Sequence, residues 1–282
     1  MFILPCGHIN LDISPCYNIA MSTKLSVLMI TKNAAETLEK SLASVKKIAD
    51  EIIIVDSKST DRTVEIVRKV LKVHKVYKVF VKEFADIGRQ RIYGLNKAIG
   101  DWILILDSDE VVSKELSKEI FTLLNGYIVK ENGFYIRYQN HYLGRSLKYG
   151  GENYKMLRLF KRNKLLIKSS LVHNKIELIS GKVGKLEGKI LHFSYRSIPQ
   201  IFSKFTDYGV RMAKEKRLAG EKSSLKKVFL YPPHLFWARF IKDKGYQDGL
   251  FRIPLDLGFA YMEFIIYISL AFLNIKNKKL KI

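Results

Sequence analysis

The feature that most constrains the fold of this chain is an alternation of apolar runs and amphipathic stretches in its first half. The runs that predict strands lie at 24–33, 51–63, 75–81 and 101–107, and stretches with helical spacing lie between them at 34–45, 63–72 and 88–100. Strands this apolar are buried on both faces, which is typical of parallel sheets covered by helices. The sequence therefore predicts an α/β fold with a Rossmann-like, mostly parallel central sheet flanked by helices.

Polar side chains gather where the predicted strands end. Thr31 and Asn33 follow the first strand, Asp56 ends the second, and Asp107 and Asp109 end the fourth. Ligands of such sheets bind at the carboxyl ends of the strands. The sequence contains neither a Gly-rich dinucleotide fingerprint nor a GxxxxGK loop, so the phosphates of a bound nucleotide must be held in another way.

The stretch WILILDSDE, residues 102–110, places clustered carboxylates directly after a buried strand. One explanation is that one aspartate caps the next helix and the other is a solvated surface residue. The other explanation is that Asp107 and Asp109 hold a hard divalent cation through oxygen ligands, and their place at the ligand edge favours it. Asp56 is either a turn residue or an acceptor for a ribose hydroxyl or a base N–H.

Taken together, these motifs resemble glycosyltransferase family 2. The elements are Thr-x-Asn at 31–33, Asp-x-x-Ser-x-Asp at 56–61 and Asp-x-Asp at 107–109 within AIGDWILILDSDEVVS. Within that family, LRLFKR at 157–162, the Val-His pair at 172–173 and the segment 192–197 resemble lipopolysaccharide-core glucosyltransferases. The resemblance covers roughly residues 24–200.

The resemblance implies a GT-A fold that binds a nucleoside diphosphate sugar, with UDP-glucose as the suggested donor. Asp56 would contact the base or ribose, next to Thr31 and Asn33. Asp109, with Asp107, would hold Mn²⁺ or Mg²⁺ against the diphosphate, where the cation stabilises the leaving group as a Lewis acid. The family block favours a metal or phosphate contact for His173, whereas His192 is predicted to be a satisfied core or turn histidine.

Two arginines of the helix at 88–100 are further candidates for the donor site. Arg89 or Arg91 would add charge-assisted hydrogen bonds to the donor phosphates. The alternative for each is a solvated helix face.

An inverting transferase also needs a base for the proton of the acceptor hydroxyl. From residue 132 to residue 206 the acids are Glu152, Glu177 and Glu187. Glu152 follows two glycines, which allow backbone freedom beside a substrate, and it is the predicted base.

The C-terminal third is basic and aromatic. Of its residues from 196 onward, 17 are Lys or Arg and 7 are Asp or Glu, and the whole chain has a formal net charge of +22. The apolar run 257–273 contains Glu263 and follows Asp256, so it predicts a buried or interfacial helix rather than a spanning one. We expect a loosely packed extension at 1–20, a GT-A domain at 21–196, and a helical region at 197–282 that associates with membranes.

The predicted function is metal-dependent, inverting transfer of a sugar to a lipid-linked or anionic glycan such as lipopolysaccharide core. The expected place is the cytoplasm, peripheral to the inner face of the cell membrane, with an anionic membrane surface and no nucleic acid as partner. A sugar nucleotidyltransferase is a weaker alternative because TKNAAETL lacks the Gly-rich basic loop of such enzymes. A nucleic-acid-binding protein would explain the charge but not the carboxylates, and an arm that supports a dimer is a further alternative for the tail.

Overall fold

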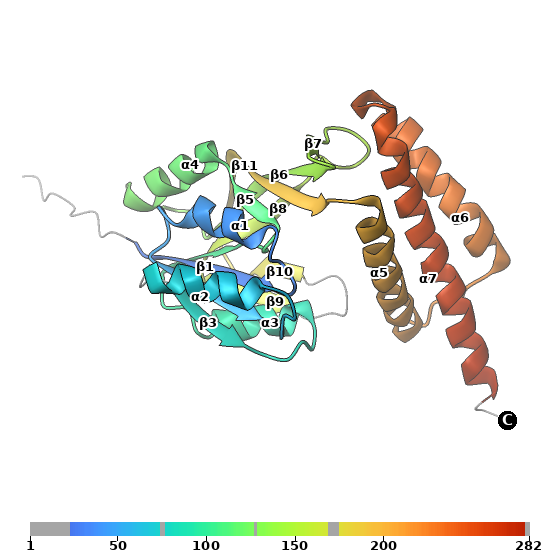
Figure 1. Ribbon diagram of the computed structural model, residues 1–282, viewed down its shortest axis with the longest axis horizontal. Coiled ribbons are helices and arrows are strands. Elements are labelled where there is room, and N and C mark those ends of the chain that lie inside the picture. Colours follow the sequence, from blue (N-terminus) through green and yellow to red (C-terminus); the bar gives the residue numbers. More distant parts are fainter. Residues whose placement is uncertain (1–22, 74–76, 127–128, 169–174, 280–282) are drawn as a thin grey trace, which may run out of the picture.

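The structure is a computed structural model that describes residues 23–73, 77–126, 129–168 and 175–279 (Figure 1). The predicted extension at 1–20 and the predicted ligand His173 lie outside the described residues. The strands are β1 (Leu25–Thr31), β2 (Glu51–Asp56), β3 (Tyr77–Val81), β4 (Trp102–Ile105), β5 (Glu110–Val112), β6 (Gly133–Tyr142), β7 (Arg145–Ser146), β8 (Lys155–Lys161), β9 (Leu165–Lys168), β10 (Lys175–Leu178) and β11 (Val183–Tyr195). The helices are α1 (Leu38–Val45), α2 (Thr63–Val73), α3 (Ile87–Leu95), α4 (Lys114–Asn125), α5 (Ile198–Leu218), α6 (Leu225–Trp237) and α7 (Ile253–Lys279), with short helical turns η1 (Arg162–Lys164), η2 (Ala238–Lys242), η3 (Gly245–Asp248) and η4 (Leu250–Arg252).

The central sheet has the strand order β3-β2-β1-β4-β8-β6-β11-β5, with β7 paired to β6. Its first four strands are parallel, as the alternation of strands and helices predicts. Beyond β4 the sheet is mixed, because β8 runs antiparallel to both of its neighbours and β5 is antiparallel to β11. The α/β class is confirmed, and beyond β4 the one parallel pair among the described strands is β6 with β11.

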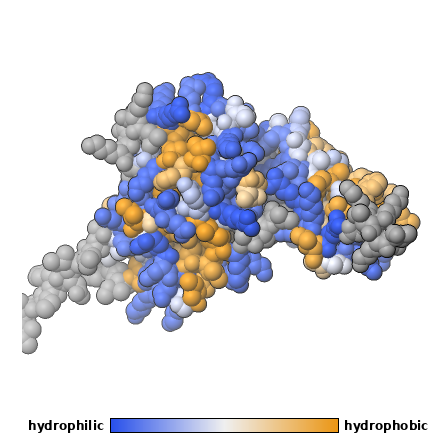
Figure 2. Space-filling model, turned by 90° about the horizontal axis from the view of Figure 1, so that it is seen from below, coloured by the Kyte–Doolittle hydropathy of each residue, from blue (hydrophilic) through white to orange (hydrophobic). Residues whose placement is uncertain are grey.

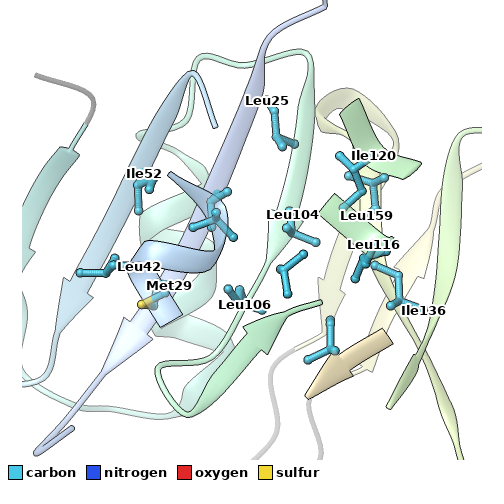
Figure 3. Close-up of a cluster of buried hydrophobic side chains, with 14 of the residues drawn as sticks. Leu25, Met29, Leu42, Ile52, Leu104, Leu106, Leu116, Ile120, Ile136 and Leu159 are labelled. Carbon is cyan, nitrogen blue, oxygen red and sulfur yellow. The ribbon is translucent and has the colours of Figure 1, made fainter. Parts of the chain in front are cut away.

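Both faces of β1, β2 and β4 are buried, with successive side chains pointing to opposite sides, whereas the edge strand β3 is partly exposed. Met29, Ile52 and Leu104 belong to the cluster under α1 and α4, which Figure 3 shows in close-up. Leu28 and Ile53 belong to a second cluster on the other face, under α3. Burial on both faces explains why these strands read as nearly continuous apolar runs.

The helix predicted at 88–100 ends earlier than its terminal glycine indicates. Helix α3 stops at Leu95, and Gly100 lies in the connection to β4. A Cβ atom at Gly100 would lie 2.5 Å from the Ser26 hydroxyl oxygen and 2.7 Å from the Ser26 backbone nitrogen. The glycine is therefore required by close packing of the connection against β1, not by a helix cap.

Three long helices form a separate layer beside the sheet (Figure 1). Helix α5 follows β11, and α7 packs against both α5 and α6. Buried side chains of α5, α6 and α7, among them Ala213, Val228 and Ile266, form their own apolar cluster. This layer confirms the predicted helical C-terminal extension, although α6 continues through Pro232 and Pro233, which the sequence did not predict to lie within a helix.

A buried arginine attaches this layer to the loop before β8. Arg252 is fully buried, and its guanidinium donates to Asp256 at 2.8 Å and to Asp248 at 2.9 Å. It also donates to the backbone carbonyl oxygens of Tyr149 and Gly150 at 2.8 and 3.0 Å. Because the carboxylates and carbonyls compensate the buried charge, the corner where α7 begins is held in one position against residues 149–150.

Candidate active site

A cavity of about 790 Å³ lies between the carboxyl ends of the parallel strands and the helical layer. On the sheet side its lining includes Thr31, Asp107 and Asp109. On the helix side Lys204 and Arg211 of α5 line it. The cavity therefore belongs to both of the predicted domains, because the boundary expected at 196/197 runs along its wall.

Asp107 is held at this edge by two arginines. Arg91 Nη2 lies 2.7 and 2.8 Å from the two carboxylate oxygens, and Arg158 Nη2 lies 3.2 Å from one of them. Burial would raise the pKa of Asp107, but the guanidiniums of Arg91 and Arg158 outweigh it and lower the pKa to about 2. Asp107 is therefore ionised at neutral pH, and both of its oxygens already accept hydrogen bonds.

Glu110 is the buried member of the acidic group. It accepts a hydrogen bond of 2.8 Å from the Tyr138 hydroxyl and one of 2.9 Å from Arg158. The backbone N–H of Asp107 donates to its other oxygen at 2.9 Å. Burial raises the pKa of Glu110. Glu110 thus fixes the turn that carries Asp107 and is itself removed from the solvent.

Unpaired polar atoms concentrate around the cavity. Among the described residues, seven buried side-chain N or O atoms have no hydrogen-bond partner, and four of them belong to Thr31, Arg91 and Arg158. All three of these residues line the cavity. Buried polar groups are normally paired, so this concentration is typical of a site that is completed by a ligand or by water.

Asp109 lies next to a histidine that also lines the cavity. The His192 Nε2 atom is 3.5 Å from an Asp109 carboxylate oxygen, and its Nδ1 is 2.7 Å from the Asn140 side-chain oxygen. Burial lowers the pKa of His192, but the Asp109 carboxylate raises it by more. Conversely, burial opposes ionisation of Asp109, but His192 and Lys204 hold its pKa well below the usual range. His192 is thus well satisfied, as predicted, but it contacts the acidic motif rather than lying away from the site.

The acidic edge suits a divalent cation only in part. Within the described ranges, no group of three or more His, Cys, Asp or Glu side chains is arranged as a metal site made by protein alone. Asp109 has a partly exposed carboxylate, and one of its oxygens lies 3.5 Å from His192 Nε2. One such carboxylate, with diphosphate oxygens and water, is a ligand set that Mg²⁺ and Mn²⁺ accept. Asp107 fits this role less well, because its oxygens face two guanidiniums.

Two of the residues predicted to contact the nucleoside, Asp56 and Asn33, are hydrogen-bonded to the loop after β2. Asp56 is buried, and its carboxylate accepts hydrogen bonds from the backbone N–H of Ser59 at 2.9 Å and from the Ser59 hydroxyl at 2.6 Å. The Asn33 side-chain oxygen accepts from the Thr60 backbone N–H at 2.8 Å, and Asn33 has a φ of 51°. A left-handed conformation is uncommon outside glycine, and asparagine is among the residues that tolerate it. These bonds tie the loops after β1 and β2 together.

The two arginines of α3 differ in position. Arg91 is buried and faces the cavity, as predicted. Arg89 is 71% exposed and pairs at 3.2 Å with Asp86, the N-cap of α3. Arg89 therefore lies on the solvated helix face, which was the alternative for this residue.

The predicted base, Glu152, is buried beside the cavity but does not line it. One of its oxygens accepts from Asn140 at 2.6 Å, and the other pairs with Arg239 of η2. An acid that does line the cavity is Asp207 of α5, which is 57% exposed and pairs with Arg211 at 2.9 Å. The sequence analysis did not single out Asp207, Lys204 or Arg158. Only Arg158 carried a signal, since it lies within LRLFKR.

Comparison with known proteins identifies the family of the chain. Residues 26–176 match the family described as glycosyl transferase family 2. An uncharacterized glycosyltransferase of Rickettsia conorii is 27% identical over 93% of this chain and 94% of its own. The lipopolysaccharide core biosynthesis glycosyltransferase LpsC of Rhizobium meliloti is 26% identical over 80% of this chain and 84% of its own. A solved mannosyltransferase of Pyrobaculum calidifontis, in complex with GDP-Man and Mn²⁺, is 14% identical over 89% of this chain and 76% of its own, with a TM-score of 0.49.

The family match covers more than half of the chain and includes the strands that end at Thr31, Asp56 and the Asp107–Asp109 motif. The mixed sheet with helices on both faces is the α/β arrangement that the GT-A resemblance implied. The chain is therefore a transferase that belongs to glycosyltransferase family 2.

Proposed function

We propose that this enzyme moves a sugar from a nucleoside diphosphate sugar, with UDP-glucose as the first candidate, to a cell-surface glycan or lipid-linked acceptor such as lipopolysaccharide core. The observation that carries the proposal is the composition of the cavity. Acids at the strand ends face Lys204 and Arg211 of α5 across a space of about 790 Å³. Such a cavity holds a dianionic diphosphate by its basic wall and a polar sugar by its acidic edge.

The departing diphosphate gains negative charge during transfer, and the site supplies compensation for it. Lys204 and Arg211 provide positive charge from α5, and Arg158 provides it from β8. A Mn²⁺ or Mg²⁺ ion held by Asp109 would supply Lewis-acid stabilisation of the same leaving group. Asp107, fixed by Arg91 and Arg158, orients polar groups of the donor rather than acting as a free ligand.

Inversion at the anomeric carbon requires a base on the acceptor side. Two carboxylates compete for this role: Glu152, predicted from the sequence, and Asp207, which faces the cavity. Asp207 has the better geometry because its carboxylate is exposed to the space where an acceptor hydroxyl would lie. Glu152 would first have to leave Arg239 and Asn140.

The proposal also places the enzyme in the cytoplasm, at the inner surface of the cell membrane. Its support is the basic, aromatic C-terminal third together with a lipid-linked acceptor. Aromatic and lysine side chains together are typical of proteins that lie at a bilayer interface.

The test is a titration of the full chain with UDP, GDP and ADP, each with and without Mn²⁺, followed by a donor-hydrolysis panel of nucleotide sugars. We expect one nucleoside diphosphate to bind at least tenfold more tightly when Mn²⁺ is present, and its glucose or other hexose conjugate to be hydrolysed. Equal and weak binding of all three, together with tight binding of single-stranded RNA, would contradict the proposal.

A further inference from the structure

The outer side of α6 carries an unusual row of exposed apolar side chains. Phe229 is 64% exposed, Leu230 56%, Trp237 51% and Ile241, in the following turn η2, 45%. Side chains four positions apart lie on one side of a helix, so Phe229, Trp237 and Ile241 form a stripe. We call these four residues the apolar face of α6. Apolar surface is visible at this end of the molecule in Figure 2.

The apolar face of α6 is separate from the cavity. None of its four residues lines the cavity, whose helical wall comes from α5 and α7. Helix α6 forms the outer edge of the helical layer, on the far side of α7 from α5 (Figure 1). A surface that contacts this face would leave the cavity open.

Exposed lysines surround the apolar face. Lys222 and Lys226 lie at the start of α6, and Lys242 and Lys244 lie just beyond its end. Within the part of the chain that the structure describes, none of the four forms an ion pair. The exposed acid among them is Asp243. An apolar stripe between unpaired lysines is complementary to a surface that is apolar inside and anionic outside, which describes a bilayer with anionic headgroups.

Helix α7, not α6, has the length and composition of a membrane span, with a mean hydropathy of 1.6 over a window within Leu250–Ile275. Its packing keeps it in the protein. Asp256 is fully buried and bonds to Arg252 and Arg239, and Gly209 of α5 lies so close to α7 that a Cβ would be 2.7 Å from Ile265. Moving α7 into a bilayer would break these contacts and carry a buried charge network into lipid.

The backbone of α6 limits how deep it can lie. Pro232 and Pro233 have no N–H, so the carbonyls of Val228 and Phe229 lack their usual helical donors. Unpaired carbonyls are costly in hydrocarbon but can be satisfied by water and headgroups at the interface. The helix therefore suits the headgroup region and not the bilayer centre.

We propose that the apolar face of α6 docks on the surface of an anionic lipid bilayer, with α6 lying in the plane of the membrane and α7 remaining packed in the protein. This inference rests on the proposed function only in that a membrane-bound acceptor gives such docking a purpose. Docking would hold the cavity beside the bilayer without inserting the catalytic domain.

Trp237 makes the proposal measurable, since the chain has two tryptophans and the other, Trp102, is 2% exposed. The full chain is mixed with vesicles of phosphatidylglycerol and phosphatidylcholine or of phosphatidylcholine alone. With the anionic vesicles we expect a blue shift of Trp237 emission and quenching by lipids brominated near the headgroup more than by lipids brominated near the chain ends. The Trp237→Phe variant should still sediment with the vesicles but lose both signals.

Matched variants then test the surface itself. Phe229→Glu with Leu230→Glu should weaken sedimentation with anionic vesicles at least tenfold. A control with equally exposed apolar residues elsewhere, Phe121→Glu with Ile179→Glu, should bind as the wild type does. Lys226→Glu with Lys242→Glu should also weaken binding, and high salt should mimic it. UDP binding is measured for every variant, so a folded protein and the donor site are checked independently of lipid.

Several results would overturn the proposal. These are an unchanged Trp237 spectrum with anionic vesicles, equal binding by the α6 and control variants, and stronger quenching near the chain ends, which would indicate insertion. A Trp237 response to single-stranded RNA but not to vesicles would assign the surface to nucleic acid instead. A wild type that binds vesicles but binds none of UDP, GDP and ADP would instead contradict the proposed function and leave this proposal standing.

Discussion

At the scale of single residues, the two aspartates of the Asp-x-Asp motif have different surroundings. Asp107 is held by two arginines, whereas the ion pair of Asp109, among the described residues, is with His192 at 3.5 Å. Replacing Asp109 by Asn should therefore remove the Mn²⁺-dependent part of donor binding. Calorimetric titration with and without Mn²⁺ measures this, and a variant that keeps the full metal effect would show that Asp109 is not a ligand.

Asp107→Asn should instead cost stability. It leaves the buried guanidinium of Arg91 without the carboxylate it pairs with, and Arg158 keeps only its pair with Glu110 at 2.9 Å among the described residues. The lowered pKa of about 2, against an ordinary value of 3.8, corresponds to about 2 kcal/mol. A depressed pKa stabilises the folded state above the unfolded pKa, and this contribution is lost as the pH falls from about 4 to 2. In urea unfolding, the difference in unfolding free energy between the wild type and Asp107→Asn should shrink over that pH range. A difference that does not change with pH would be inconsistent with this ion pairing.

The transfer rates of two variants distinguish the two candidate bases, Asp207 and Glu152. If Asp207 takes the acceptor proton, Asp207→Asn should lower the rate of transfer by about 10²–10⁴-fold with unchanged donor affinity and stability. Glu152→Gln should then lower stability, because Arg239 loses one of its two charged partners among the described residues and keeps Asp256, while much of the rate remains. The opposite pattern, with the rate lost only in Glu152→Gln, would restore the assignment predicted from the sequence.

The sequence was sufficient to predict the residues that follow apolar strands directly. Thr31, Asp107 and Asp109 reach the cavity because the carboxyl ends of adjacent parallel strands meet at one edge. Arg158 could not be placed, because its position depends on β8 lying beside β4 in one register, with Leu159 opposite Leu104. The spacing of apolar residues shows which face of a strand is buried, but it does not show which strand lies beside it. Asp207 required, in addition, that α5 fold back over the sheet.

At the scale of elements, α6 shows tertiary contacts overriding local preference. Two successive prolines disfavour a helix interior by about 3 kcal/mol each, yet the helix continues through them. Val228 is buried against α7, and Tyr231 packs edge-on against Tyr267 at 5.3 Å between ring centroids. The two prolines therefore predict a break in the helix, but the packing of α6 against α7 keeps the helix continuous.

The element that joins the layer to the sheet domain is the corner around Arg252. Arg252→Met fills a similar volume but removes the fully buried cation that pairs with both Asp248 and Asp256, so Asp256 keeps only Arg239 among the described residues. We expect a loss of about 3–5 kcal/mol in the free energy of unfolding. The matched control is Arg211→Met, which removes a partly exposed arginine of α5 and should cost less than about 1 kcal/mol. If both variants lose the same free energy of unfolding in urea, the contacts of Arg252 do not hold the helical layer to the sheet domain.

At the scale of the whole molecule, the predicted boundary at 196/197 runs along the wall of one cavity. The cavity takes one wall from the sheet and the other from α5 and α7. Tyr142 of β6 and Leu147 pack with Ile201, Phe205 and Leu255 in a shared apolar cluster. Composition reveals that the C-terminal third differs from the rest, but not that it completes the site, because that depends on contacts between distant segments.

A chain that ends after Ser197 should therefore lose donor binding, not only membrane attachment. It lacks Lys204 and Arg211, exposes the apolar side chains that α5 and α7 cover, and leaves Glu152 without Arg239. We expect no detectable UDP binding by calorimetry and a Tm at least 10 °C lower, since several kcal/mol of burial are removed (about 2 kcal/mol for each large apolar side chain). The matched control is Phe229→Glu with Leu230→Glu, which keeps the layer and should bind UDP as the wild type does. A truncated chain that binds UDP normally would show that residues 21–196 form a complete donor site and that the helical layer serves the membrane or the acceptor alone.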